Sequence, residues 1–281
     1  MIMLTLQDPA TITSKVSIGM PVYNGEKFIR EALESLLTQT FTDFELIISD
    51  NASTDGTEAI CHEYAARDPR IRYIRQSENR GATANFQFVL DEAVGEYFMW
   101  AAADDRRNPE FLRLALSVFE DDDDCGLVFC DYHSMDLKTK RSVRHHVGMY
   151  NSKNPGKNYL IRLLAPCANI IYGLHKTSIL KKMPIESYDF FDVHLTHAYA
   201  INSVVKIIPN ALFIAGSWGV RIPYSLTGHR IDPRTFFKEE RLMLFKHLSF
   251  FSALFLYVLL RYMYIKSMYH LRRSENLKIC S

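Results

Sequence analysis

The sequence predicts an α/β fold, in which a mostly parallel sheet is flanked by helices and followed by a C-terminal helical extension. Short apolar segments with the length of strands alternate with segments whose apolar residues recur at helical spacing through the first half of the chain. Strands separated by helices of this length pair in parallel and are covered on both faces. Polar segments follow three of these strands, and ligands bind in such sheets outside the carboxyl ends of the strands.

Five strands are expected in the first half of the chain. Each is an apolar run bounded by polar or turn-forming residues, and they are Val16–Met20, Phe44–Ser49, Ile71–Arg75, Tyr97–Ala101 and Leu127–Cys130. Pro21 is expected to stop the first strand, because proline cannot donate a hydrogen bond to a sheet. Helices are expected between the strands, over Lys27–Gln39, from Ser53 or Thr54 onward, over Ala82–Ala93 and over Pro109–Phe119.

The alternation of strands and helices weakens after Asp131. Gly, Asn, Lys and Pro cluster over Gly148–Lys157 and predict a loop. Three further elements are expected: strands over Ile170–His175 and Val204–Ile208, the latter stopped by Pro209, and a helix over Phe190–Ala200. From Pro233 onward the apolar spacing predicts helices.

The stretch Leu248–Leu260 carries no charge and is apolar on every face, but it is too short to span a bilayer. Only Glu275 opposes the cationic residues that follow, which are Arg261, Lys266, Arg272, Arg273 and Lys278. This combination suits a helix lying in the interface of an anionic membrane, with contact through residues 242–278. A buried helix or a contact in a homo-oligomer explains the apolar stretch equally well.

The composition excludes several classes of protein. The chain of 281 residues has 33 Lys+Arg against 32 Asp+Glu and a net charge of +1, which gives no signal for nucleic-acid binding. The five cysteines are scattered and lack a C-x-x-C pair, which argues against a zinc site or a disulfide framework. Residues Met1–Lys15 are too polar for a secretory signal. We therefore expect a cytoplasmic protein, at the inner face of the cell membrane if its C-terminal helices bind lipid.

Two adjacent carboxylates, Asp104 and Asp105, end the apolar run of the fourth predicted strand. Adjacent carboxylates at the end of a buried strand repel each other and lose hydration, so a divalent cation with oxygen ligands is expected there. A surface turn is the alternative, since Asp, Asn and Pro are ordinary turn residues. The metal is favoured by other polar segments that should reach the same edge of the sheet, which are Pro21–Glu26, Asp50–Thr57 and Glu78–Gly81.

These motifs, in this order, resemble those of the family 2 glycosyltransferases, which are nucleotide-sugar-dependent enzymes of the GT-A fold. The resemblance runs from about Val16 to Cys130. Val-Ser-Ile-Gly-Met-Pro-Val-Tyr-Asn-Gly is similar to the family's opening strand and turn, and Ile-Ser-Asp-Asn-Ala-Ser-Thr-Asp-Gly-Thr to its D-D-G-S-T-D-G-T segment. Asn79-Arg80-Gly81 with Asn85, then Gly95-Glu96-Tyr97, resembles the stretch before the family's metal motif. Many members read L-D-x-D-D at that motif. In this chain Ala102 stands in place of the first of those three aspartates, and Asp104 and Asp105 match the other two.

The resemblance implies a donor site that holds a divalent metal ion, either Mn²⁺ or Mg²⁺. Asp105 would be the direct metal ligand, and Asp104 would contact the ribose, the metal shell or both. Asp50 would accept a hydrogen bond from the imide N–H of uracil or thymine, while an Asx turn or a helix cap is its structural alternative. Three more residues would line the nucleotide pocket, which are Pro21, Tyr23 and Arg80.

An inverting transferase needs a carboxylate that takes the proton of the acceptor hydroxyl. In the family this residue comes from the second half of the domain, beside an E-D pair before a helix. The segment Tyr188–His194 of this chain matches that region loosely and lacks the E-D pair. The candidates for the base, in order of preference, are Asp192, Asp189 and His194. The segment Val220–Ser225 resembles the family's Y-R-x-x-x-x-S stretch, so Arg221 would contact the diphosphate or close a loop over it, with His229 as a weaker candidate.

The resemblance therefore predicts an inverting glycosyltransferase that moves a sugar from a UDP- or dTDP-sugar to a glycan, a lipid-linked acceptor or another cell-envelope acceptor. Residues 1–232 would form the GT-A domain, with a nucleotide-sugar-binding half over 15–131 and an acceptor-binding half over 132–232. Residues 233–281 would form the helical extension. A non-catalytic nucleotide-sugar-binding or scaffold protein is the first alternative, because the match at Asp189–His194 is loose. A nucleotidyltransferase is less favoured, because Pro21–Lys27 offers one Gly and one Lys for a phosphate loop.

Overall fold

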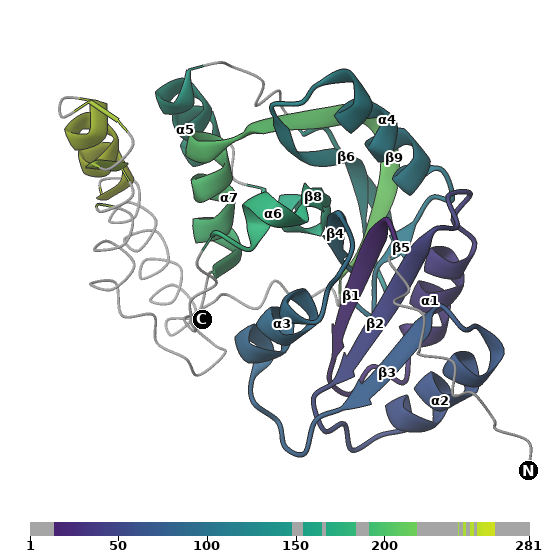
Figure 1. Cartoon of the computed structure of the whole chain (residues 1–281). Helices are drawn as coiled ribbons and strands as arrows, with labels where there is room; N and C mark the ends of the chain where they lie inside the picture. Colours follow the sequence, from purple (N-terminus) through teal and green to yellow (C-terminus); the bar gives the residue numbers. More distant parts are fainter. Residues whose placement is uncertain are drawn as a thin grey trace, which may run out of the picture.

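A mixed sheet of nine strands forms the centre of the part of the chain that the structure describes (Figure 1). The structure is a computed structural model, and it describes residues 14–147, 154–164, 167–183, 191–217, 241, 244–245, 248–249 and 252–261. The strand order is β3-β2-β1-β4-β8-β6-β9-β5, and β7 pairs with β6 outside this path. The predicted α/β class with a mostly parallel sheet is confirmed.

The first half of the chain forms parallel strands joined by helices. The strands are β1 (Val16–Val22), β2 (Phe44–Asp50), β3 (Ile71–Arg75) and β4 (Tyr97–Trp100). The helices are α1 (Ile29–Leu37), α2 (Thr57–Arg67), α3 (Ala82–Asp91) and α4 (Phe111–Asp121). Right-handed crossovers place α1 and α2 on one side of β1–β3 and α3 on the other, as Figure 1 shows. Strands β1, β2 and β4 are largely apolar because both faces of the sheet are covered there, whereas the edge strand β3 alternates apolar residues with arginines.

The second half adds antiparallel pairs to the sheet. Its strands are β5 (Arg106–Arg107), β6 (Cys125–Asp136), β7 (Ser142–His145), β8 (Leu174–Lys176) and β9 (Val204–Ser217). Its helices are α5 (Pro155–Leu164), the 3₁₀ helix η1 (Ala168–Tyr172), α6 (Thr177–Leu180) and α7 (Phe191–Asn202). Strand β8 runs antiparallel to both β4 and β6, so β6 points in the same direction as β4 and β1. The carboxyl end of β6 therefore reaches the same edge of the sheet as the carboxyl ends of β1 and β4.

Both predicted proline stops are wrong. Strand β1 continues through Pro21 to Val22. The pairing of β1 with β4 ends at Gly19, so Pro21 lies in a part of β1 that pairs with β2 on one side and with no strand residue of β4 on the other. Strand β9 continues through Pro209, because the ladder with β6 has a bulge there: Cys130 pairs with Ile208 and Asp131 with Ala211. In both places the proline sits where the sheet does not need its missing N–H.

Several element ends shift by one or two residues, and β6 runs over Cys125–Asp136 rather than Leu127–Cys130; three further differences concern the start or the type of an element. Helix α2 begins at Thr57 rather than at Ser53 or Thr54, because Ser53 accepts a hydrogen bond from the backbone N–H of Asn24 instead of capping the helix. The strand expected over Ile170–His175 is a 3₁₀ helix followed by the short β8. A helix begins at Pro155, inside the segment expected to be a loop.

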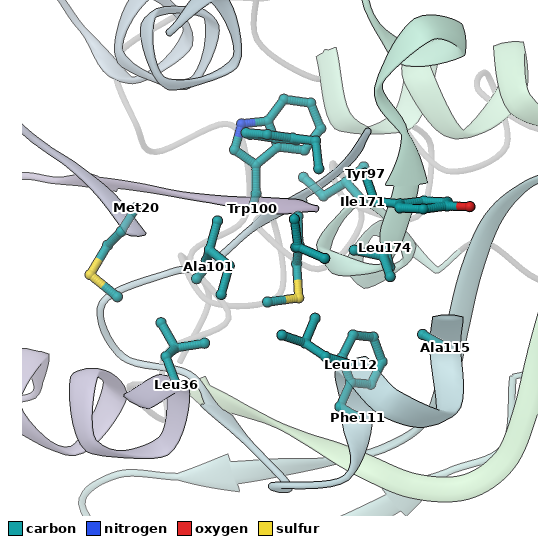
Figure 2. Packing of buried hydrophobic residues seen from close by; sticks show 14 of the residues in the cluster. Met20, Leu36, Tyr97, Trp100, Ala101, Phe111, Leu112, Ala115, Ile171 and Leu174 are labelled. Atoms are coloured by element: carbon teal, nitrogen blue, oxygen red, sulfur yellow. The ribbon is translucent and has the colours of Figure 1, made fainter. Parts of the chain in front are cut away.

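The core packs around Trp100, the last residue of β4 (Figure 2). Its side chain is fully buried, and its indole Nε1 donates to the backbone carbonyl of Phe86 at 3.1 Å. The side chains around β4 come from both halves of the chain, and Figure 2 labels Leu36, Phe111, Leu112, Ile171 and Leu174 among them. This packing holds the end of β4 rigidly, and with it the turn that carries Asp104 and Asp105.

The described part of the C-terminal extension includes a helix over residues 252–261. One of its faces is buried against Tyr159 of α5 and Ile201 of α7, through Ala253, Leu256 and Leu260. The opposite face exposes apolar side chains, with Leu254 41%, Phe255 61% and Val258 57% exposed. Within the described residues, no helix has both the length and the apolar character needed to cross a membrane.

Candidate active site

The polar segments that follow β1, β2 and β4 lie at one edge of the sheet, because these three strands are parallel neighbours. Val22 pairs with Asp50, so the turn after β1 and the turn after β2 start side by side. Asp104 and Asp105 follow β4 on the other side of β1. The tertiary structure thus brings the predicted nucleotide and metal segments together.

The carboxylate of Asp50 is fully buried and is bound on both oxygens. Oδ1 accepts from the backbone N–H of Ser53 at 2.8 Å, and Oδ2 accepts from the Tyr73 hydroxyl at 2.8 Å and from Arg75 Nη1 at 2.9 Å. Burial, followed by the hydrogen bond to Asp50, raises the pKa of Tyr73. The bond to Ser53 is the Asx turn considered as the structural alternative, so Asp50 shapes its own loop and also keeps an acceptor at this edge.

Arg75, at the end of β3, is a residue that sequence reasoning missed. Its Nη2 donates to the backbone carbonyl of Ser53 at 3.0 Å while Nη1 binds Asp50, so one guanidinium holds both the carboxylate and the loop after it. A charged residue at a strand end reads as a solvated side chain in the sequence. Only the parallel pairing of Asp50 with Arg75 across β2 and β3 reveals the contact.

Backbone and side-chain hydrogen bonds join the turns after β1 and β2. The backbone N–H of Asn24 donates to Ser53 Oγ at 2.9 Å, and Asn24 Oδ1 accepts from the backbone N–H of Thr54 at 2.8 Å. Asn24 and Ala52 both have positive φ, 54° and 59°, a conformation that favours glycine or asparagine. Ala52 stands where the resembling family motif has glycine, and its backbone conformation explains that preference. Tyr23 lies beside this junction and is 48% exposed, and Pro21 is partly buried.

The segment before α3 is attached to the same edge by Asn51. Its Nδ2 donates to Asn79 Oδ1 at 2.8 Å and to the backbone carbonyl of Gly81 at 3.2 Å. Its Oδ1 accepts from the backbone N–H of Arg80 at 2.9 Å. The backbone of Arg80 is therefore fixed near the predicted nucleotide site, while its side chain is exposed and available to a ligand.

Asp105 and Asp104 differ in their surroundings. Asp105 is only 8% exposed, and its Oδ1 accepts from the backbone N–H of Gly216 on β9 at 2.9 Å. Burial and then the neighbouring carboxylate of Asp104 raise the pKa of Asp105 to about 8, against the opposing effect of the Arg107 guanidinium. Asp104 is partly exposed. Of the two carboxylates, that of Asp104 is the more exposed to solvent.

The donor atoms of this turn fit a divalent cation that shares its coordination with a substrate. Two adjacent carboxylates, one of which has its pKa raised by burial and then by the charge of the other, are an environment that a cation would stabilise. Among the described residues, no group of three or more His, Cys, Asp or Glu side chains is arranged to hold a metal ion. Mg²⁺ is commonly bound by one or two carboxylates together with substrate phosphates, which matches this donor set.

Arg107 is a second residue that sequence reasoning missed. It is 5% exposed, its guanidinium lies 3.9 Å from the centroid of the Phe213 ring, and its Nη2 donates to the carbonyl of Tyr172 at 2.6 Å. Among the residues that the structure describes, none forms a hydrogen bond with its Nε or Nη1. Burial lowers the pKa of Arg107, and the carboxylate of Asp105 opposes this shift. Arg107 thus connects the carboxylate turn to β9 and to η1.

Asp192, the preferred candidate for the catalytic base, lies in the first turn of α7 and is partly exposed. Burial raises the pKa of the Tyr172 hydroxyl, and the carboxylates of Asp105, Asp104 and Asp192 raise it further. The carboxylate of Asp192 and those of the turn therefore both raise the pKa of the Tyr172 hydroxyl. Asp189, Arg221 and His229 lie outside the described residues.

The fold and the site define a class of protein, an α/β domain with carboxylates and polar turns at the carboxyl ends of adjacent parallel strands. A family profile described as "Glycosyl transferase family 2" matches residues 17–188, which is more than half of the chain. The chain belongs to glycosyl transferase family 2, as the motifs predict.

Curated relatives match shorter segments. The chain is 36% identical over 121 residues to chondroitin synthase of Escherichia coli, covering 43% of this chain and 18% of that protein. It is 36% identical over 94 residues to the glycosyltransferase GlyA of Streptococcus pneumoniae serotype 4, covering 34% of this chain and 13% of the relative. The matched segments span less than half the length of each of these relatives.

Solved structures show the same fold at lower sequence identity. The S. aureus TarS 1–349 structure in complex with UDP-GlcNAc has a TM-score of 0.63 and 22% identity, covering 82% of this chain and 65% of that one. The mannosyltransferase PcManGT of Pyrobaculum calidifontis, in complex with GDP-Man and Mn²⁺, has a TM-score of 0.54 and 19% identity, covering 84% and 64%.

Proposed function

We propose that the protein is an inverting, metal-dependent glycosyltransferase that uses a UDP- or dTDP-sugar and acts on a glycan, a lipid-linked acceptor or another cell-envelope acceptor. The observation that carries this proposal is the placement of Asp50 and the Asp104–Asp105 turn at the carboxyl ends of strands that flank β1. The carboxylate of Asp50 would bind the base, and those of Asp104 and Asp105 would serve the diphosphate end of the same donor. Relatives named as glycosyltransferases and a chondroitin synthase support the reaction class and a role in polysaccharide synthesis.

Asp50 would select the base of the donor. Its carboxylate is fully buried and accepts three of the roughly four hydrogen bonds that a carboxylate can accept, so the imide N–H of uracil or thymine would reach the remaining acceptor position only after the loop over Asp50 moves. Tyr23 and Arg80 have exposed side chains beside the same turns, and they would contact the base and the phosphates. A bound UDP-GlcNAc in the TarS structure supports the uridine choice.

Asp104 would be the direct metal ligand, and Asp105 would hold the turn in place. This assignment follows from exposure, because Asp105 is buried and bound to Gly216 whereas Asp104 is partly exposed. A divalent ion bound there supplies charge stabilisation for the diphosphate leaving group. The Mn²⁺ in the PcManGT complex supports this cofactor.

Asp192 would take the proton of the acceptor hydroxyl. Its position at the start of α7 puts its carboxylate within electrostatic reach of Tyr172, which the carboxylate turn also reaches. A general base must lie within hydrogen-bond distance of the attacking hydroxyl, and the partial exposure of Asp192 supports its assignment to this role. Asp189 remains the second candidate, and Arg221 the candidate for closing over the diphosphate.

A donor screen with matched variants tests the proposal. Thermal shift with Mn²⁺ and UDP-, dTDP- or GDP-sugars should show stabilisation by the true donor class through mass action. Asp104→Asn should lose the metal-dependent part of that shift, and Asp192→Asn should keep donor binding but lose transfer. Retained transfer by Asp104→Asn under chelation would refute the metal role. A wild-type protein that binds donor but supports neither transfer nor donor hydrolysis would favour the non-catalytic alternative.

The C-terminal extension would make a peripheral contact with an anionic membrane, and residues 1–232 would form the catalytic domain. The exposed face of helix 252–261, formed by Leu254, Phe255 and Val258, supports this contact, since its opposite face is already buried against the domain. Phe255→Ser should reduce co-flotation with phosphatidylglycerol vesicles. Val94→Ser, which removes an exposed apolar side chain elsewhere, is the control. Equal flotation of wild type and Phe255→Ser would contradict the contact.

A further inference from the structure

The hairpin formed by β6 and β7, residues 131–146, presents a cluster of cations to solvent. The exposed cationic side chains of this hairpin are Lys138, Lys140, Arg141 and Arg144. Lys140 and Arg141 form no ion pair within the part of the chain that the structure describes. The hairpin turn is tight: the backbone N–H of Lys140 donates to the carbonyl of Asp136 at 2.7 Å, and Lys140 has a φ of 59°.

The two acids of the hairpin are engaged within it. Asp136 Oδ1 accepts from the backbone N–H groups of Lys138 and Thr139, both at 2.9 Å, and so caps the turn. The side chain of Asp131 is 5% exposed, and it accepts from the backbone N–H of Val147 at 2.9 Å. The solvent-facing charge of the hairpin is therefore positive.

Asp131 also offsets part of the charge at the base of the hairpin. His146 Nδ1 lies 2.7 Å and Arg144 Nη2 3.4 Å from Asp131 Oδ2. Neither contact reaches the turn, where Lys140 and Arg141 lie. At the tip, the cations Lys138, Lys140 and Arg141 face a single carboxylate, that of Asp136, so the tip carries a net positive charge.

The hairpin stands next to the carboxylate turn of the candidate active site. Met135 of β6 pairs with Gly216 of β9, and the N–H of Gly216 is the donor to Asp105. Arg106 connects the two features, because its Nη2 lies 3.0 Å from the Met135 sulfur and its Nη1 lies 2.7 Å from Glu31. Since β6 runs in the direction of β1 and β4, the tip projects past the edge where Asp50 and Asp104 lie.

We propose that the β6–β7 hairpin binds an acceptor glycan that is itself anionic and guides it to the carboxylate turn. This inference rests on the proposed function and specifies the chemistry of its acceptor. Lys and Arg side chains bind phosphate and carboxylate groups through charge-assisted hydrogen bonds. An acceptor that repeats such groups would engage the tip while its terminal hydroxyl reaches Asp192. Cations beside a site also raise the rate of encounter with an anionic substrate.

Direct binding of two fluorescent oligomers tests the proposal. One is an oligomer of glycerol phosphate, the other an oligomer of glucuronic acid, and neutral dextran of the same length is the reference. The variant Lys140→Gln/Arg141→Gln removes two charges from the tip, and Gln at position 140 meets the same positive φ as Lys does. The control Lys181→Gln/Lys182→Gln removes two charges next to Ala93, before the start of β4 at the opposite edge of the sheet.

Wild type should bind at least one anionic oligomer and not dextran, with weaker binding at high salt. The tip variant should lose about fivefold or more in affinity at low ionic strength, and the control should change by less than about twofold. Equal affinity of wild type and tip variant, or no preference of wild type over dextran, would overturn the inference. Loss of binding to phosphatidylglycerol vesicles with unchanged oligomer binding would assign the hairpin to a membrane instead and also overturn it.

Donor binding separates this inference from the proposed function. The tip variant should keep the wild-type thermal shift with the nucleotide sugar and Mn²⁺, because within the described part of the chain neither Lys140 nor Arg141 forms an ion pair with the turns that carry Asp50 and Asp104. If no nucleotide sugar stabilises any of the proteins, the proposed function fails whatever the oligomers do. If donor binding is normal and the tip variant binds the oligomers like wild type, only the acceptor inference fails.

Discussion

Asp105 and Gly216 are joined by a hydrogen bond of 2.9 Å from the backbone N–H of Gly216 to Asp105 Oδ1, although 111 residues separate them in the chain. The bond ties the turn after β4 to the end of β9. A Cβ on Gly216 would lie 2.4 Å from the backbone oxygen of Asp104, so only glycine allows this close approach. The carboxylate turn therefore depends on a strand from the second half of the domain.

Replacing Gly216 by alanine should move the carboxylate turn. Because the new Cβ meets backbone rather than a flexible side chain, we expect a loss of about 1–3 kcal/mol in the free energy of unfolding, together with weaker metal-dependent donor binding. Denaturant unfolding and thermal shift with Mn²⁺ and donor measure the two effects. Gly156→Ala is the matched control, since its nearest neighbour would be at 3.4 Å. Similar behaviour of both variants would contradict the prediction.

Arg75 should control donor binding through Asp50. Arg75→Met removes the hydrogen bonds to Asp50 and to the carbonyl of Ser53, and should cost about 1–2 kcal/mol of stability, since the Arg75 side chain is 35% exposed and the broken pair is only partly buried. The Kd for the donor should rise at least tenfold, a change that calorimetry measures. Arg75→Lys keeps the charge but not both hydrogen bonds, so its donor Kd should lie between those of wild type and Arg75→Met. An unchanged donor Kd in Arg75→Met would show that Asp50 does not need this support.

Ala52→Gly should stabilise the protein or leave its stability unchanged. The φ of 59° at Ala52 is strained for alanine and unstrained for glycine, and relief of this strain should offset the greater backbone entropy of glycine in the unfolded state. We expect a gain of up to about 1 kcal/mol in the free energy of unfolding. The same substitution at Ala65, inside helix α2, should instead cost about 1 kcal/mol. A loss at Ala52 as large as the loss at Ala65 would disprove the argument.

His175 should make stability depend on pH below neutrality. It is fully buried, its Nδ1 lies 2.8 Å from the Tyr199 hydroxyl, and its Nε2 lies 2.8 Å from the carbonyl of Ile171. Because a carbonyl only accepts, Nε2 carries the proton and Nδ1 accepts from Tyr199. Burial lowers the pKa of His175 from 6.5 to about 4.

Between pH 6.5 and 4 the unfolded chain binds a proton at His175 that the folded protein excludes. The contribution to stability is therefore present above pH 6.5 and is lost as the pH falls towards 4, by up to about 3 kcal/mol. Denaturant unfolding of wild type and His175→Gln across this range measures it. The variant should show the smaller slope, because the titration of the carboxylates is common to both proteins. Equal slopes would contradict the assignment.

Local sequence patterns were sufficient for much of the fold. Strand β3 has the predicted bounds Ile71–Arg75, and the apolar runs of β1, β2 and β4 lie where they were expected. These runs identify strands because a buried parallel strand must be apolar on both faces. The order of polar segments in the chain was also enough to predict the family and the candidate residues Asp50, Asp104 and Asp105.

The same local reasoning failed where a distant strand supplies the partner. Pro209 was expected to end a strand, and the bulge that accommodates it, with Pro209 and Asn210 as the extra residues of β9 between the partners of Cys130 and Asp131, is defined only by the pairing of β9 with β6. The sequence pattern assigned no role to Arg75 or Arg107, because their contacts with Asp50 and Tyr172 depend on which strands lie side by side. No local pattern encodes such pairings.

The sequence by itself determined the strands and helices of the first half, the membership of glycosyl transferase family 2 and the carboxylates of the candidate donor site. Periodicity and motif order carry that information because they depend on neighbours in the chain. Only the tertiary structure decided that Asp105 is buried against Gly216, that Asp104 is the more accessible carboxylate, and that the cationic hairpin stands beside them. Those relationships arise from the pairing of β6 with β9, which joins residues far apart in sequence through hydrogen bonds that no local pattern specifies.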